Sequence, residues 1–203
     1  MKGLLWKDFY MVKKYCKAFL FIVIVFAAAA AFNPENNFFL VYPIILTSVI
    51  PITLLSYDEK CKWVLYADVL PCSRAMAVSA KYLTVCFSLL TCLVITGGTQ
   101  VIRMAVLGQW DFVFLLQLCF LFITAGLTLP GFMLPVIFRV GTEKGRILYY
   151  IAIGILCAAA GVLSIEQTGT FQTWPLWIIA IGAIILFVLS WLLSIRLYQK
   201  REL

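Results

Sequence analysis

Residues 38–56 read FFLVYPIILTSVIPITLLS, and residues 82–102 read YLTVCFSLLTCLVITGGTQVI. Each run is apolar over about the 20 residues that a helix needs to cross the hydrocarbon core of a bilayer. Between them lies a charged and aromatic segment, YDEKCKWVLYADVLPCSRAMAVSAK. This pattern predicts two membrane-spanning helices with an organised connection on one side of the membrane.

The same alternation runs through the whole chain of 203 residues, of which 64% are hydrophobic and 12% charged. Such a composition excludes an ordinary soluble domain. We predict an all-α integral membrane protein in which residues 18–203 form a single domain of six transmembrane helices. The predicted spans are about 18–33, 38–56, 82–102, 112–137, 147–165 and 175–195.

The basic residues predict the orientation, because short loops rich in Lys and Arg stay in the cytoplasm. With both termini cytoplasmic, only Arg103 of the 16 Lys and Arg residues lies in an outside segment. The outside connections are short, so no receptor domain or surface enzyme is expected. Inside segments carry Lys2, Lys7, Lys13, Lys14, Lys17, Lys60, Lys62, Arg74, Lys81, Arg139, Lys144, Arg146, Arg196, Lys200 and Arg201.

Two cytoplasmic segments are amphipathic. Residues 1–17 place Leu5, Phe9 and Val12 at helical spacing, which predicts an interfacial helix; a merely basic tail is the alternative. Residues 58–70 predict a short charged and aromatic helix, ended by a proline, with Ser73 as N-cap of the next helix. Such a surface suits docking of another protein, although it could also only anchor the loop. The candidate docking residues are Asp58, Glu59, Lys62, Trp63 and Tyr66.

A second cytoplasmic contact is predicted in the compact basic turn of residues 138–147, at Glu143, Lys144 and Arg146. Within the spans, prolines free backbone carbonyls that must find partners in protein or in a hydrated cavity. Polar side chains predict a possible substrate path; packing between helices, with Arg103 reaching the outer interface, is the alternative. The path candidates are Thr96, Gln100, Arg103, Gln117 and Thr124.

Several chemistries are excluded by what the sequence lacks. The chain has no histidine, which removes histidine-based nucleophile activation and His-ligated zinc. No phosphate-binding loop is present, and every carboxylate lies in a loop or at the end of a span. We therefore expect no catalytic residue, no metal and no cofactor in this chain. The net charge of +7 is explained by topology and by attraction to membrane lipids rather than by binding of nucleic acid.

Several strings resemble the permease subunits of bacterial type-2 ABC transporters, more narrowly the small six-span permeases that work with a separate ATPase. They are Leu4-Leu5-Trp6-Lys7-Asp8-Phe9, Ser56-Tyr57-Asp58-Glu59-Lys60-Cys61-Lys62-Trp63, Leu70-Pro71-Cys72-Ser73-Arg74, Lys81-Tyr82-Leu83 and the run from Pro135 to Arg146. The resemblance implies a bacterial plasma-membrane subunit that pairs with a second copy or a sister permease. It also implies a cytoplasmic ABC ATPase that binds ATP and Mg²⁺ and docks on the helix of residues 58–70.

The resemblance further implies export of a peptide or another amphipathic molecule. Two other classes are open. A membrane enzyme would need ionisable residues clustered at membrane depth, whereas a sensor, assembly or immunity protein would keep the topology without needing an ATPase. An ATPase that co-purifies with the chain would distinguish the transporter subunit from both.

We predict the topology of three positions. In a cysteine-free background, single cysteines replacing Asn36 and Gly169 should react with an impermeant thiol reagent in intact cells. A cysteine replacing Glu143 should react only after the membrane is permeabilised, because residues 138–147 are expected in the cytoplasm. Labelling of the Glu143→Cys variant from outside would overturn the orientation.

Overall fold

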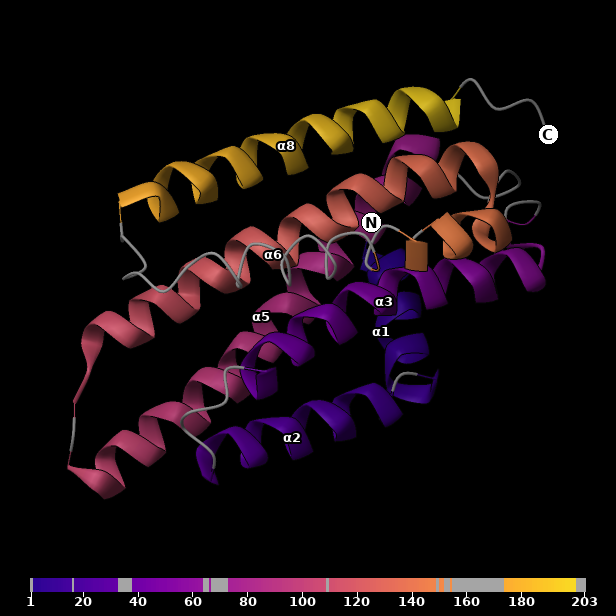
Figure 1. Ribbon diagram of the computed structural model, residues 1–203. Coiled ribbons are helices and arrows are strands. Elements are labelled where there is room, and N and C mark those ends of the chain that lie inside the picture. Colours follow the sequence, from indigo (N-terminus) through magenta and orange to yellow (C-terminus); the bar gives the residue numbers. More distant parts are fainter. Residues whose placement is uncertain are drawn as a thin grey trace.

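The computed structural model describes residues 2–15, 17–32, 38–63, 66, 73–108, 110–148, 150–151, 154 and 174–199, and within these ranges it contains helices and no strand. Figure 1 shows most of the helices packed lengthwise as a bundle, with α1 steeply inclined to them. They are α1 (Lys2–Tyr15), α2 (Lys17–Phe32), α3 (Phe38–Lys60), α5 (Arg74–Leu107), α6 (Phe112–Val140) and α8 (Trp174–Gln199). Residues 142–148 form a further helical segment.

Three of the described helices are long and apolar enough to cross a membrane: α5, α6 and the part of α8 from Trp177 to Tyr198. The apolar stretch Lys17–Ala30 of α2 is shorter. Residues 155–165, most of the predicted fifth span, lie outside the described residues. The all-helical prediction is confirmed for the part of the chain that the structure describes, whereas the number of spans stays a prediction.

The end of α3 differs from the predicted boundary, whereas the start of α5 agrees with the prediction. The predicted separate helix of residues 58–70 does not begin at Asp58, because Asp58 to Lys60 are the last residues of α3. α3 does not stop near Ser56 but continues to Lys60, and the chain then turns at Lys62, whose φ is 51°. A residue in this left-handed region commonly ends a helix. α5 begins at Arg74, with the Ser73 side chain accepting a hydrogen bond from the backbone N–H of Met76. The prediction of Ser73 as N-cap is therefore confirmed.

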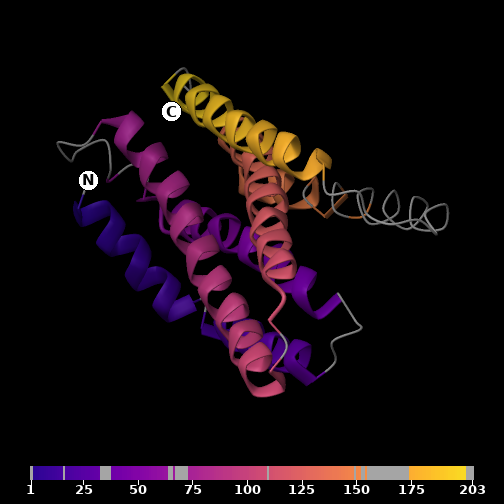
Figure 2. The same cartoon turned by 90° about the vertical axis from the view of Figure 1, so that its left-hand side faces the viewer.

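Contacts between helix ends gather the basic segments at one end of the bundle. Asp58 at the end of α3 meets Lys81 in the early part of α5, and the Phe138 and Tyr198 rings meet 5.4 Å apart near the ends of α6 and α8. This end, hereafter the basic end, lies at the right of Figure 1. α1 contacts the early part of α5, where the Phe9 and Phe87 rings meet 6.2 Å apart, and Figure 2 shows the two helices next to each other.

α6 and α8 run in the same direction. Phe120 lies against Trp177 near their starts, with ring centroids 4.4 Å apart, and Phe138 lies against Tyr198 near their ends. The end of α6 and the start of α8 are therefore at opposite ends of this helix pair. Residues 141–173 have to connect those two ends.

A hydroxyl from α8 replaces a backbone hydrogen bond that a proline removes from α6. Pro135 has no N–H to offer the carbonyl of Gly131, four residues earlier. The Ser190 hydroxyl donates to that carbonyl instead. Because a hydroxyl carries one proton, the Tyr82 hydroxyl of α5 then donates to Ser190, at 2.8 Å, and accepts from Ser194, at 2.7 Å. This chain of hydrogen bonds ties α5, α6 and α8 together.

We expect Ser190→Ala to lower the free energy of unfolding by about 1–2 kcal/mol, because it leaves the Gly131 carbonyl unpaired in an apolar environment. In a Pro135→Ala background the loss should be smaller, since alanine at this position restores an N–H within the helix. Unfolding of the purified protein in detergent measures both losses. Ser88→Ala is the matched control, because the Ser88 hydroxyl donates to the Val85 carbonyl of its own helix, at 2.9 Å, and to no other helix among the described residues. Equal losses from Ser190→Ala in both backgrounds would contradict this account.

Candidate functional site

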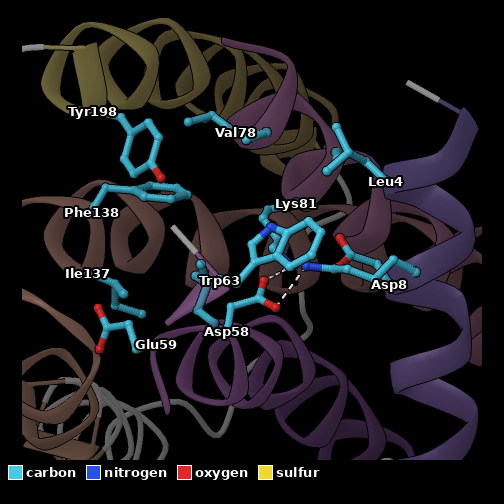
Figure 3. Close-up of a pocket in the computed structure, with 14 residues that line it drawn as sticks. Leu4, Asp8, Asp58, Glu59, Trp63, Val78, Lys81, Ile137, Phe138 and Tyr198 are labelled. Atoms are coloured by element: carbon cyan, nitrogen blue, oxygen red, sulfur yellow. Dashed lines mark hydrogen bonds and ion pairs between the residues drawn. The ribbon is translucent and has the colours of Figure 1, made fainter. Parts of the chain in front are cut away.

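A pocket at the basic end lies between α1, α3 and α5, with α6 and α8 on its far side, and Figure 3 shows its lining residues. Four charged side chains meet there: Lys7 and Asp8 from α1, Asp58 from α3 and Lys81 from α5. They come from three helices that are separate in the sequence, and they meet only when the chain folds. We call these four residues the charge cluster.

The cluster alternates positive and negative groups at short distances. Lys81 Nζ lies 2.6 Å from Asp8 Oδ1 and 2.7 Å from Asp58 Oδ2. Lys7 Nζ lies 2.8 Å from Asp58 Oδ1 and 3.6 Å from Asp8 Oδ1. Each ammonium group therefore lies between two carboxylates, and the four formal charges cancel.

Three members of the cluster are almost inaccessible to solvent. Asp8 is 1% exposed, Lys81 is 6% exposed and Asp58 is 7% exposed. Buried charges are tolerated only when they are paired and hydrogen-bonded, and removal of one partner leaves the other uncompensated. The second oxygen of Asp8 also lies 3.5 Å from the Thr84 hydroxyl. The arrangement thus holds α1, α3 and α5 in one relative position.

Lys7 is the most accessible member, and Trp63 covers it. The Lys7 ammonium lies 4.0 Å from the centroid of the Trp63 ring, a cation–π contact. Burial lowers the pKa of Lys7 below its ordinary value and Lys81 lowers it further, while Asp58 and Asp8 act in the opposite direction. The Trp63 ring covers the side of the cluster on which Lys7 is accessible to solvent.

Glu59 connects the same end of α3 to the segment that follows α6. Its carboxylate accepts hydrogen bonds from the Thr142 hydroxyl and from the Thr142 backbone N–H, the latter at 3.1 Å. Glu59 thereby caps the helical segment of residues 142–148 from another element. Gly145 of that segment packs so closely that a Cβ would lie 2.5 Å from Ile137 Cγ1. Figure 3 shows Asp58 and Glu59 pointing in different directions from α3.

The structure divides the predicted docking residues into two groups. Asp58 is buried and Glu59 is half-buried, and both are engaged in contacts within the chain. Trp63 is half-buried over Lys7, whereas Lys62 and Tyr66 are exposed. The hydrogen bonds between Glu59 and Thr142 bring the predicted second contact next to the end of α3. The three residues of that contact are exposed: Glu143, Lys144 and Arg146.

The predicted path residues lie on two helices and are only partly connected. On α5, Thr96 and Gln100 are fully buried, and Arg103 donates to Gln100 Oε1 at 3.2 Å. The Gln100 Nε2 group has no hydrogen-bond partner within the described ranges. On α6, Thr124 bonds the Phe120 carbonyl of its own helix, at 2.8 Å, and Gln117 is half-buried. Among the described residues, no hydrogen bond joins the α5 group to Gln117 or Thr124.

Sequence reasoning missed four residues of this site: Lys7, Asp8, Lys81 and Thr142. From the sequence, Lys7 and Lys81 indicate the orientation and, like Asp8, belong to strings that carry the resemblance, but no contact among the three is predicted. One signal was available, since Asp8 is the single acidic residue among the first 17 and lies on an otherwise basic helix. A lone carboxylate there calls for a cationic partner, but the spacing along the chain could not say which one.

A family model described as "ABC-2 family transporter protein" matches residues 3–199, nearly the whole chain. The chain belongs to this family. It is thus the membrane component of a transporter, a permease, and the family supports a multi-pass membrane protein. The predicted resemblance to type-2 ABC permeases is confirmed. No curated protein and no solved structure matches the chain.

Proposed function

We propose that this ABC-2 permease is the transmembrane subunit of an exporter in the bacterial plasma membrane. Two copies, or one copy and a sister permease, form the substrate path. A separate cytoplasmic ABC ATPase, which binds ATP and Mg²⁺, drives transport. The substrate class we propose is a peptide or another amphipathic molecule. The observation that carries the proposal is the charge cluster, because it gives an external motor a rigid point of attachment to three helices.

Six spans with the basic end in the cytoplasm agree with the helix directions. Because α6 and α8 run in the same direction, the chain between them has to return along the length of the pair. Residues 147–165 supply an apolar run of the right length for that return. The contacts between the ends of α3, α6 and α8 also gather three predicted cytoplasmic segments in one place.

The docking surface that we propose consists of the exposed residues around the charge cluster. Lys62 and Tyr66 follow the end of α3, and Glu143, Lys144 and Arg146 lie on the segment that Glu59 caps. Trp63 is the anchor between this surface and the interior, since its ring packs on Lys7. Asp58 and Glu59 lie inside this surface and hold it in place through their contacts with Lys81 and Thr142. The two contacts predicted separately from the sequence therefore form one docking surface.

A movement of the ATPase at this surface reaches the predicted spans through a few direct contacts. Lys81 and Tyr82 are consecutive residues of α5, and both are buried. Lys81 is paired with α1 and α3, whereas Tyr82 is hydrogen-bonded to Ser190 and Ser194 of α8. Movement of the end of α3 is therefore passed through α5 to α8 without a flexible joint.

For the substrate path, Gln100 is the candidate with the strongest support. Its buried amide nitrogen lacks a partner within the described ranges, although a buried donor without a hydrogen bond is unfavourable. A polar group of a substrate, or a residue of the second permease, would satisfy that donor. Arg103 and Thr96 lie on the same face of α5 and extend this polar strip along the helix.

We predict that Trp63→Ala weakens co-purification of the ATPase by about tenfold or more, because truncation of a buried aromatic anchor removes about 2 kcal/mol of binding free energy. Lys60→Ala should have a much smaller effect, since Lys60 is exposed and charges at a rim contribute little. The measurement is retention of tagged ATPase by each permease variant in mild detergent, together with ATP-driven transport in vesicles.

Trp63→Phe is the matched control, because it keeps an aromatic ring over Lys7. An unchanged unfolding midpoint for Trp63→Ala shows that any loss comes from docking and not from collapse of the charge cluster. Full retention and transport by Trp63→Ala would place the docking site elsewhere. If no ATPase co-purifies with the unaltered chain, the alternative of a non-transporting sensor, assembly or immunity protein is favoured.

A further inference from the structure

A second and larger cavity of about 620 Å³ opens between α1, α2, α3 and α5. Its volume is in the range of small-molecule sites in proteins. Leu5 and Phe9 of α1 form one wall and Leu83 and Phe87 of α5 form another, with the buried Ile50 of α3 at the floor. The Phe9 and Phe87 rings meet edge to face, 6.2 Å apart, and are 49% and 58% exposed. We call this cavity the α1–α5 groove.

The groove offers an occupant almost no hydrogen bonds. Three hydroxyl residues of α5 line it, and each hydroxyl donates to a carbonyl of its own helix: Thr84 to Ala80, Ser88 to Val85 and Thr91 to Phe87, at 2.8–2.9 Å. The amide groups of a bound peptide would be left without partners there, which is unfavourable. The walls therefore fit a hydrocarbon chain.

Exposed cations lie next to the groove. Lys13 follows Phe9 by one helical turn on α1, and Lys17 precedes Leu20, another lining residue, by three positions on α2. The carboxylate of Asp8 is already paired with Lys81, so it does not offset these cations. Basic residues next to an apolar groove at the membrane surface attract an anionic lipid headgroup.

We propose that the α1–α5 groove binds one phospholipid with an anionic headgroup, with an acyl chain between α1 and α5 and the headgroup at Lys13 and Lys17. The bound lipid fills the space between the first helix and the bundle. It thereby helps to hold α1 in place. This proposal does not depend on ATPase docking, since none of the exposed docking residues lines the groove.

The test uses a photoreactive benzoylphenylalanine in place of Phe87, in the full-length chain reconstituted in phosphatidylcholine vesicles with a minor fraction of phosphatidylglycerol. After irradiation, mass spectrometry identifies the lipid attached to the protein. Phosphatidylglycerol should be enriched about tenfold or more over its share of the vesicle, as expected for two basic residues near one anionic headgroup. The same probe in place of Phe132, an exposed residue of α6 outside the groove, should capture the two lipids in their bulk ratio.

The double variant Lys13→Gln, Lys17→Gln should abolish the enrichment at Phe87 while keeping lipid capture. Lys60→Gln with Arg139→Gln removes two exposed cations away from the groove and should leave the enrichment unchanged. Capture at Phe87 in the bulk ratio, or enrichment that survives the Lys13 and Lys17 changes, would overturn the proposal. Absence of any lipid adduct at Phe87, with normal capture at Phe132, would overturn it as well.

Discussion

The ion pairs of Lys81 are the interaction on which the rest of the basic end depends. The Lys81 ammonium lies within 2.7 Å of carboxylates from α1 and from α3, and it is nearly excluded from solvent. Such a buried charge contributes little net stability when paired, but it strongly disfavours any arrangement in which a partner moves away. The ion pairs therefore specify the positions of three helices relative to one another. Apolar packing alone specifies these positions less strictly.

α5 unites the two polar networks of the protein. One side of its first turns carries Lys81 and the charge cluster, and the next residue, Tyr82, carries the hydroxyl chain to Ser190 and the carbonyl freed by Pro135. Pro135, which weakens α6, is therefore compensated by Ser190 of α8 rather than left as a hinge. The proposed function needs such continuity, because a cytoplasmic ATPase would contact the predicted spans only at their ends.

Sequence patterns predicted the helices well and the site only in part. Apolar runs and the Ser73 cap are local properties, so they could be read from spacing. The end of α3 is predicted too early, because Asp58 and Glu59 are assigned to a separate short helix of residues 58–70 rather than to α3. Their partners Lys81 and Thr142 are not evident from the sequence. Those partners are 23 and 83 positions away, and no periodicity links them. Pairings between helices are set by packing, which a single sequence does not display.

The central claim is that Lys81 holds α1 and α3 on α5 through paired, buried charges, and a double-mutant cycle in purified protein tests it most directly. Lys81→Met should lower the free energy of unfolding by about 3–5 kcal/mol, because it leaves Asp8 and Asp58 sharing only Lys7. Adding Asp8→Leu should restore much of that loss, since an apolar pair can replace a buried ion pair of similar volume. Additive losses from the two substitutions would contradict the account.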